Sequence, residues 1–229
     1  MAYAILLAGG IGTRTGLNIP KQFFQIKDKP FLAYCIDKFV PITEFKKIVI
    51  SSPREYIKET NNIINSFFPD DDRLVVIEGG ETRNDTLNNS LNYINEIKEE
   101  ENPIGIKHAS ARIFVSTDLI RQCLELTKKY GAAGPIIRST DFIIEAKDNN
   151  VLNIPPRENI VNVQTPQGFR LKEYLETYND LKPEEIPTIH DLISLYYLRG
   201  KKVYLFDGDK TNFKITTPVD VEIAKEFLL

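Results

Sequence analysis

Three glycines and two cations near the N-terminus predict a phosphate-binding site. Gly9, Gly10 and Gly12 directly follow a short apolar run, and Arg14 and Lys21 come next. A strand that ends in a glycine turn leaves backbone N–H groups free to bind phosphate, and nearby cations add fixed positive charge. The alternative is an ordinary tight turn between a strand and a helix, with two solvated cations.

The spacing of these residues argues against two common phosphate loops. A Walker A loop ends in Gly-Lys-Ser/Thr, whereas Gly16 is followed by Leu17. A dinucleotide fingerprint needs Gly-x-Gly-x-x-Gly, and here the third glycine comes one residue late. It also needs an acidic residue after the second strand, but the expected strand at 46–52 ends in serines. The pattern therefore favours a polyphosphate site over hydride transfer.

Four motifs follow one another along the chain: Leu7-Ala-Gly-Gly-x-Gly-x-Arg14 with Pro20-Lys-Gln22, Gly79-Gly-Glu-Thr-Arg-Asn-Asp-Thr86, Gln164-Thr-Pro-Gln167, and Asn212-Phe-Lys-Ile-Thr-Thr-Pro218. Together they resemble the sugar-nucleotide cytidylyltransferases, in the branch of the methylerythritol-phosphate and ribitol-5-phosphate enzymes. The resemblance covers nearly the whole chain. The Ala-Gly-Gly, Pro-Lys-Gln-Phe and Lys-Ile-Thr-Thr-Pro segments look closer to the ribitol-phosphate branch.

The resemblance implies a transferase in which a substrate phosphate attacks the α-phosphorus of CTP, giving a CDP-alcohol for cell-wall or capsule polymers. Because an anion attacks an anion, such a site must supply position and positive charge. By motif match, the catalytic cations are Arg14, Lys21 and Lys214, although a surface lysine is usually only solvated. The nucleotide-binding set is Ala8, Gly9, Gly10, Gly12, Gly80, Glu81, Thr86 and Ser110.

The roles of two residues in the segment from Gly79 to Thr86 are left open. The Thr86 hydroxyl either contacts cytosine or bonds its own helix. Arg83 either orients its loop or lies on the surface.

The same resemblance implies a separate set of residues for the phosphorylated alcohol: Arg157, Thr165, His190 and Asp191. In the family pattern the arm and the partner's site supply these contacts, so a homodimer would complete each active site. His190 stands where the family has Thr or Ser, and the identity of the alcohol is left open.

The metal site departs further from the family pattern. The family has His-Asp-Ala-x-Arg-Pro and its Asp holds Mg²⁺, but Ala109 occupies that position, between His108 and Ser110. A methyl group cannot coordinate a cation that prefers oxygen ligands. We therefore expect Mg²⁺ to be held mainly by the CTP phosphates, with Asp207 and Asp209 as the nearest substitute carboxylates in sequence.

Composition narrows the function classes. The 229 residues carry a net charge of −3, with no basic stripe for nucleic acid. The N-terminal apolar run is too short to span a membrane and lacks a basic flank. Cys35 and Cys123 lie far apart within apolar stretches, which is typical of core positions in a reduced, cytoplasmic protein.

Short apolar runs alternate with longer amphipathic ones, which predicts one α/β domain over residues 1–229 with a mostly parallel sheet flanked by helices. With the resemblance, this is a Rossmann-like nucleotidyltransferase fold. Strands are expected at 3–7, 47–51, 74–77, 104–106 and 202–206. Helices are expected at 31–40, after Pro53, and at 82–98, 117–130, 171–178, 189–199 and 218–228.

Residues 135–156 interrupt this alternation. The apolar segments 142–146 and 151–154 flank the polar Lys147-Asp-Asn-Asn150, which predicts a β-hairpin. Family members use such an arm to embrace a second subunit. The alternative is an ordinary edge hairpin.

Two other functions remain open at this stage. The missing Asp is compatible with a non-catalytic homologue that still binds nucleotide. The motifs are also compatible with a transferase that uses another NTP, such as UTP.

Overall fold

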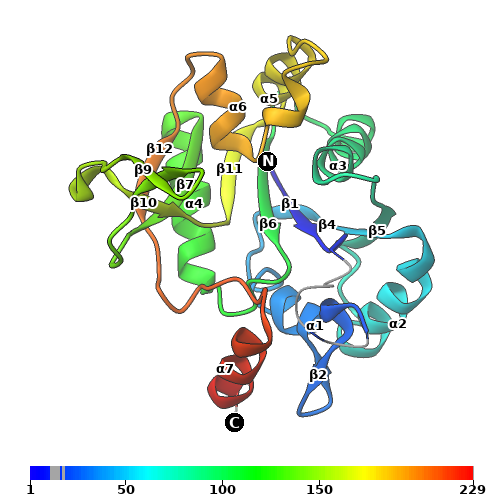
Figure 1. The fold of residues 1–229 in the computed structure, drawn as a ribbon. Helices are drawn as coiled ribbons and strands as arrows, with labels where there is room; N and C mark the ends of the chain where they lie inside the picture. The colour runs from blue at the N-terminus through cyan, green and yellow to red at the C-terminus, as the bar shows by residue number, and fades with distance from the viewer. Residues whose placement is uncertain (11–15, 17–18, 229) are drawn as a thin grey trace.

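The computed structural model of the chain describes residues 1–10, 16 and 19–228. Its centre is an eight-stranded sheet in the order β10-β7-β11-β6-β1-β4-β5, with β12 paired to β7 (Figure 1). The strands are β1 (Ala2–Leu7), β4 (Phe45–Ser52), β5 (Leu74–Glu78), β6 (Ile104–Ala109), β7 (Ala132–Arg138), β10 (Val161–Val163), β11 (Gln167–Arg170) and β12 (Tyr204–Asp207). The pairs β1·β4, β1·β6, β4·β5 and β7·β12 are parallel, so the predicted mostly parallel sheet is confirmed.

Helices cover both faces of this sheet. They are α1 (Phe31–Ile36), α2 (Ile57–Phe67), α3 (Arg83–Ile97), α4 (Thr117–Tyr130), α5 (Leu171–Asn179), α6 (Leu192–Leu198) and α7 (Pro218–Leu228). Apolar side chains of α1, α2, α4 and α7 pack on one face, and those of α3, α5 and α6 on the other. The chain therefore forms a three-layered α/β domain of the predicted class. None of the helices in the described residues is long and apolar enough to cross a membrane.

The helix ends agree with local sequence signals. Ser116 caps α4 by accepting from Leu119 N, and Gly131 ends it with a φ of 84°, which favours glycine. Thr82 and Asp85 form a capping box at the start of α3. The single-turn helices η2 (Lys21–Phe23), η3 (Arg54–Tyr56), η4 (Arg157–Asn159) and η5 (Ile186–Thr188) and the small hairpin β2 (Gln25–Ile26) and β3 (Lys29–Pro30) complete the frame.

Several predicted boundaries were wrong. The helix expected at 31–40 ends at Ile36 and continues as turns toward Pro41. The helix expected from residue 189 begins at Leu192, because Asp191 caps it. The strands β7, β10 and β11 were not predicted. Pro135 lies inside β7, where a proline argues against a strand from sequence alone.

The predicted hairpin is present as β8 (Glu145–Lys147) and β9 (Asn150–Asn153). Asp148 and Asn149 form its turn with φ values of 51° and 62°, as a tight two-residue hairpin turn requires. The arm is shorter than the predicted 135–156, since residues up to Arg138 belong to β7 in the central sheet.

Candidate active site

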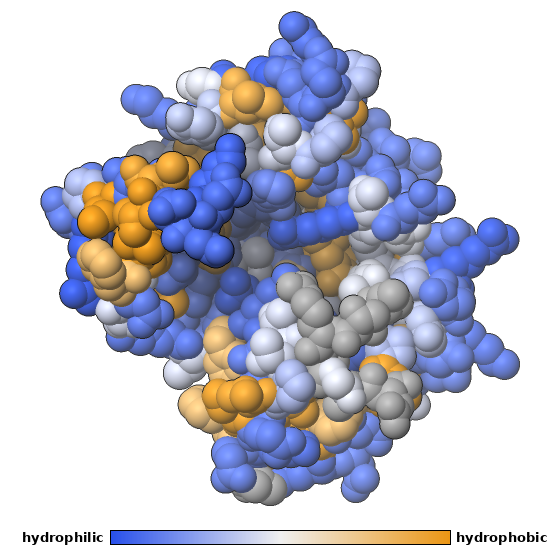
Figure 2. All heavy atoms as spheres, in the orientation of Figure 1, coloured by the Kyte–Doolittle hydropathy of each residue, from blue (hydrophilic) through white to orange (hydrophobic). Residues whose placement is uncertain are grey.

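A cavity of about 350 Å³ opens at the carboxyl edge of the parallel strands. The ends of β1 and β6, the segment between β5 and α3, η2 and the segment before α7 form its wall, as expected for ligand sites in open α/β sheets. Figure 2 shows a hollow near the centre of this face, with hydrophilic residues around much of it. The residues lining the cavity are Leu7, Gly9, Gly10, Lys21, Gln22, Gly80, Glu81, Thr82, Arg83, Thr86, Ala109, Ser110, Ala111, Lys214 and Thr216.

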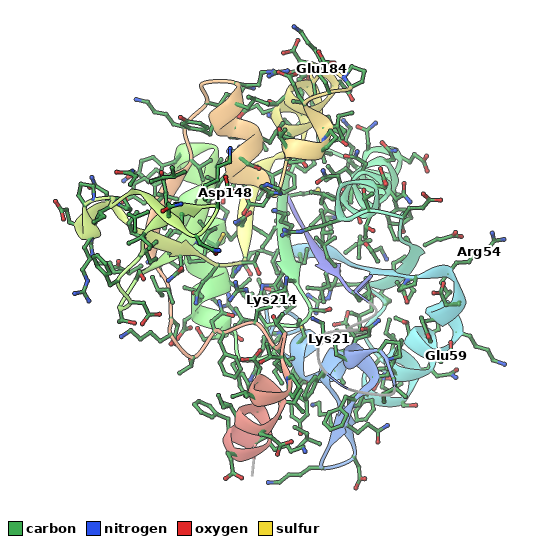
Figure 3. The ribbon with its side chains drawn as sticks, viewed as in Figure 1. Lys21, Arg54, Glu59, Asp148, Glu184 and Lys214 are labelled. Carbon is green, nitrogen blue, oxygen red and sulfur yellow. The ribbon has the colours of Figure 1, made fainter. Side chains whose placement is uncertain are left out.

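Positive charge dominates the described part of this wall. Lys21, Arg83 and Lys214 line it together with one carboxylate, that of Glu81. Lys21 and Lys214 come from opposite ends of the chain and lie near each other in Figure 3. The N-terminal end of α3 adds the positive end of a 15-residue helix. The cavity is therefore suited to an anion with several charges.

The two lysines are held by the segment that precedes α7. Lys21 Nζ donates to the Ile215 carbonyl at 3.0 Å, and Ile215 N donates to the Ala111 carbonyl at 2.9 Å. Asp220 accepts from the backbone of Thr216 and Thr217, which fixes the turn into α7. These contacts link Lys21, near the N-terminus, to the segment at Ile215 before the C-terminal helix α7.

The wall near α3 depends on a glycine and a hydroxyl. Gly80 N donates to Thr86 Oγ1 at 3.0 Å, and the same hydroxyl lies 2.8 Å from the Thr82 carbonyl, to which it can donate. A Cβ on Gly80 would lie 2.3 Å from Asp85 Cβ, so no side chain fits there without a shift of the first turn of α3. The Thr86 hydroxyl thus bonds its own helix and also anchors the Gly80 loop.

The end of β6 is held by a buried polar network. His108 contacts the Thr165 hydroxyl through Nδ1 and the Arg112 carbonyl through Nε2, both at 3.0 Å. Burial lowers the pKa of His108 to about 3, so this side chain is neutral and structural. Thr165 Oγ1 also accepts from Ala109 N, and Ser110 Oγ donates to the Leu7 carbonyl at 3.0 Å.

Most of the predicted nucleotide-site residues converge on this cavity. Gly9, Gly10, Lys21, Gly80, Glu81, Thr86, Ser110 and Lys214 all line it, while their individual roles stay predictions. Gly12 and Arg14 lie outside the described residues.

One member of the predicted set, Ala8, does not line the cavity, and its role stays a prediction. Ala8 is buried, its N–H donates to the Ser51 carbonyl, and its carbonyl accepts from Gln22 Nε2. These internal bonds engage both backbone groups that were expected to read cytosine.

The predicted acceptor residues do not line the cavity in this subunit. Thr165 is buried under β6, and Asp191 caps α6. His190 is exposed and contributes its backbone, whose carbonyl accepts from Arg83 Nη1 at 2.7 Å. Arg157 is exposed in η4 beyond the arm and donates to the Thr140 carbonyl. Thr165 and Asp191 make internal hydrogen bonds, and the predicted acceptor contacts of all four residues stay predictions.

Side chains that hold a metal ion by themselves must lie close together. No cluster of three or more metal-ligating His, Cys, Asp or Glu side chains occurs among the described residues. Asp207 ends β12 and Asp209 accepts from Thr211 N, and neither lines the cavity. The suggestion that they replace the missing carboxylate therefore gains no support from the cavity lining and stays a prediction. At position 109 the cavity wall carries only a methyl group.

We expect Ala109→Asp to lower the half-saturating Mg²⁺ concentration for turnover, because it places a carboxylate on the cavity wall. The measurement is pyrophosphate release against free Mg²⁺ at fixed CTP. Ala109→Asn is the matched control, since it has the same shape without the charge. An unchanged Mg²⁺ dependence in the Asp variant would contradict this account of the position.

Sequence reasoning gave no site role to Gln22, Thr82, Ala111 and Thr216 and left the role of Arg83 open, although all of them line the cavity. Two of these carried usable signals. Thr82 starts the Thr-x-x-Asp capping box, and Gln22 ends the Pro-Lys-Gln triplet.

Comparison with known proteins agrees with the observed fold. The family model described as IspD, 2-C-methyl-D-erythritol 4-phosphate cytidylyltransferase, matches residues 2–229. The crystal structure of the Francisella tularensis enzyme of that name is 30% identical, with a TM-score of 0.81 over 100% of this chain and 99% of that one. The Thermus thermophilus enzyme of the same name is 25% identical, with a TM-score of 0.73 over 99% and 98%.

A third structure supports the fold alone, at 21% identity. It is the 4-diphosphocytidyl-2C-methyl-D-erythritol synthase of Anaerococcus prevotii, with a TM-score of 0.83 over 100% of this chain and 98% of that one. The full-length family match, the fold and the cation-lined cavity lead to one assignment. The chain belongs to the IspD family of CTP-utilising cytidylyltransferases.

Proposed function

We propose that this cytidylyltransferase joins CTP to a small phosphorylated polyol, releasing pyrophosphate and forming a CDP-polyol. The observation that carries the proposal is the cavity in which Lys21, Arg83 and Lys214 meet the glycine backbone at the end of β1. Similar proteins are named for methylerythritol phosphate, whereas the motifs resemble the ribitol-phosphate branch. Both polyol phosphates are therefore candidate acceptors. Turnover of ribitol phosphate would imply that the product supplies cell-wall or capsule precursors.

In the proposed reaction a phosphate oxygen of the polyol phosphate attacks the α-phosphorus of CTP. The bond from that phosphorus to the oxygen bridging to the β-phosphate breaks, and pyrophosphate leaves with the electron pair. Gly9 and Gly10 would hold the triphosphate through backbone N–H groups. Lys21 and Lys214 would stabilise the charge that develops on the phosphate oxygens. The loop from Gly80 to Thr86 would read the base.

Mg²⁺ enters the proposal with the nucleotide, because Ala109 offers it no oxygen ligand and no cluster of three or more ligating side chains occurs among the described residues. It would neutralise phosphate charge when bound. We also propose a cytoplasmic location, in keeping with two buried free thiols, Cys35 and Cys123.

Nucleotide preference tests the base-reading part of the proposal. A ligand that binds only the native state raises the unfolding temperature. CTP should stabilise the protein more than UTP, ATP or GTP at equal concentration, and only CTP with a polyol phosphate should release pyrophosphate. Equal or larger stabilisation by UTP would favour the transferase for another NTP. Binding of CTP without turnover on any polyol phosphate would favour the non-catalytic homologue.

We further propose a homodimer formed through the arm. Phe142, Leu152 and Ile154 are 75%, 64% and 57% exposed. Figure 2 shows apolar side chains gathered over this region. A two-stranded hairpin is marginal alone in water, and such a surface favours a partner. Arg157, which follows the arm, would then contact the acceptor in the partner's cavity.

We expect the protein to sediment as a dimer at micromolar concentration. Leu152→Glu should shift it to monomer and reduce acceptor turnover while leaving CTP binding intact, because the nucleotide wall lies within one subunit. Asn153→Glu adds the same charge on the neighbouring exposed position and serves as the control. A fully active wild-type monomer would refute both the dimer and the shared site.

A further inference from the structure

A lysine lies buried in the middle of the central sheet, beneath the cavity. Lys107 is 1% exposed and stands in β6 two residues before Ala109. Since side chains alternate along a strand, Lys107 shares a sheet face with Ala109, which lines the cavity. Its direct neighbour across the β6·β11 pair is Gln167, also fully buried. A charged group in this position needs a partner.

The polar neighbour of this pair is Asp191 at the start of α6, which a hydrogen bond joins to Gln167. Asp191 Oδ1 accepts from Ile193 N at 2.9 Å and Ser194 N at 3.2 Å, which caps the helix. Its Oδ2 accepts from Gln167 Nε2 at 2.9 Å. Asp191 therefore links the buried polar pair on β6 and β11 to the start of α6.

The residues just before Asp191 hold one wall of the cavity. The His190 carbonyl accepts from Arg83 Nη1 at 2.7 Å, and the Ile189 carbonyl accepts from Asn84 Nδ2 at 3.1 Å. Arg83 lines the cavity. The loop that Asp191 ends is thus the anchor for the first turn of α3.

We propose that Lys107 is a positioning residue whose buried side chain, beside Gln167, supports the Asp191 carboxylate, so that the loop before α6 holds Arg83 in the cavity wall. The test of this proposal by CTP affinity rests on the proposed function, whereas its test by the titration of Asp191 does not. Lys107 acts through two other residues and need not touch substrate.

The charges around Lys107 and Asp191 agree with this role. Burial, and then Arg83, lower the pKa of Lys107 to about 7, while Asp191 opposes that shift. Burial raises the pKa of Asp191, but Lys107, Gln167, Ser194 and Arg83 together bring it below its ordinary value. Asp191 also acts on the Tyr174 phenol on α5, whose pKa burial raises above its usual range.

These directions set the pH window. Below about pH 7 Lys107 is mostly a cation and supports the Asp191 carboxylate. Without Lys107, less positive charge offsets the effect of burial on Asp191, so the pKa of Asp191 rises. Acidification should then protonate Asp191 in a range where it stays ionised in the wild type, and this would loosen the loop and Arg83. Above pH 8, where Lys107 is largely neutral, removing it should matter little for this loop.

The test compares wild type with Lys107→Met, Asp191→Asn and the double variant. CTP affinity is measured by calorimetry from pH 8 to pH 5, as a ratio to wild type so that titration of CTP itself cancels. We expect Lys107→Met to match wild type at pH 8 and to bind CTP at least threefold more weakly at pH 5. The double variant should lose this pH dependence, because Asn caps the helix without titrating. Lys46→Met removes an exposed lysine and is the control.

A second readout needs no ligand. The carbon-13 signal of the Asp191 carboxyl, identified by its absence in Asp191→Asn, should titrate at least one pH unit higher in Lys107→Met. An unchanged midpoint overturns the proposal even if the protein proves to bind no CTP. An affinity loss that is equal at every pH, or that persists in the double variant, also overturns it, since this would mark Lys107 as a packing residue. A raised midpoint with no CTP binding supports the Lys107–Asp191 link and refutes only the proposed function.

Discussion

Lys214→Ala and Lys21→Ala should each lower turnover by about 100-fold or more, which corresponds to about 3 kcal/mol of lost transition-state stabilisation. Both side chains line the cavity from opposite ends of the chain. Negative charge develops on the phosphate oxygens during the reaction. A fixed cation stabilises this charge more strongly inside the site than it would in water. Steady-state pyrophosphate release measures the effect.

The control for these variants is Lys210→Ala, which removes an exposed lysine from the same C-terminal segment. Its kinetics and the unfolding temperature of all three variants should stay close to wild type. Lys21 also bonds the Ile215 carbonyl, so its loss should affect CTP affinity as well as turnover. Kinetics within threefold of wild type would remove the substituted lysine from the mechanism.

Gly80→Ala should weaken CTP binding by about 100-fold or more, because small misplacements of positioning groups have effects of this size. An added Cβ would lie 2.8 Å from the Asp85 carbonyl carbon and 2.9 Å from Thr86 N, so backbone must move. That shift would break the bond from Gly80 N to the Thr86 hydroxyl, which sets the base-reading wall. Calorimetric titration with CTP checks this prediction.

Gly200→Ala separates this local effect from general destabilisation. Gly200 has a φ of 65° but nothing within 4 Å of an added Cβ. An alanine there strains the backbone in the connection between α6 and β12 without entering the cavity. It should reduce stability and leave CTP affinity unchanged. If Gly80→Ala binds CTP as wild type does, the loop is not the base-reading wall.

Local signals predicted the parts of the fold that depend on nearby residues. The helix at 117–130 was predicted with its observed bounds, because an apolar stripe and Gly131 define it. The strands β7 and β11 were missed because their sequences hold Pro135 and Gly168, and pairing with distant strands specifies them. Tertiary context overrides local preference in such segments.

The candidate site also contains residues that local sequence signals indicate and residues that depend on tertiary contacts. Gly80 and Lys21 were singled out because they lie in motifs that resemble those of the family, and Lys21 also adds a fixed charge beside the glycines. The engagement of Ala8 by Gln22 and Ser51 could not be read from spacing, since it depends on how η2 folds back on β1. Lys107 was overlooked, although a lysine inside the apolar segment 104–109 was a visible signal. Its partner Asp191 comes from an element distant in the sequence.

Product analysis tests the central claim most directly. The protein is incubated with CTP, Mg²⁺ and either methylerythritol phosphate or ribitol 5-phosphate, with Lys214→Ala as the control, and products are identified by mass. The account predicts equimolar pyrophosphate and a CDP-polyol from at least one acceptor, both strongly reduced in the variant. Folded wild-type protein that forms no cytidylylated product with either acceptor, or that forms a uridylylated one in its place when UTP is supplied, would contradict it.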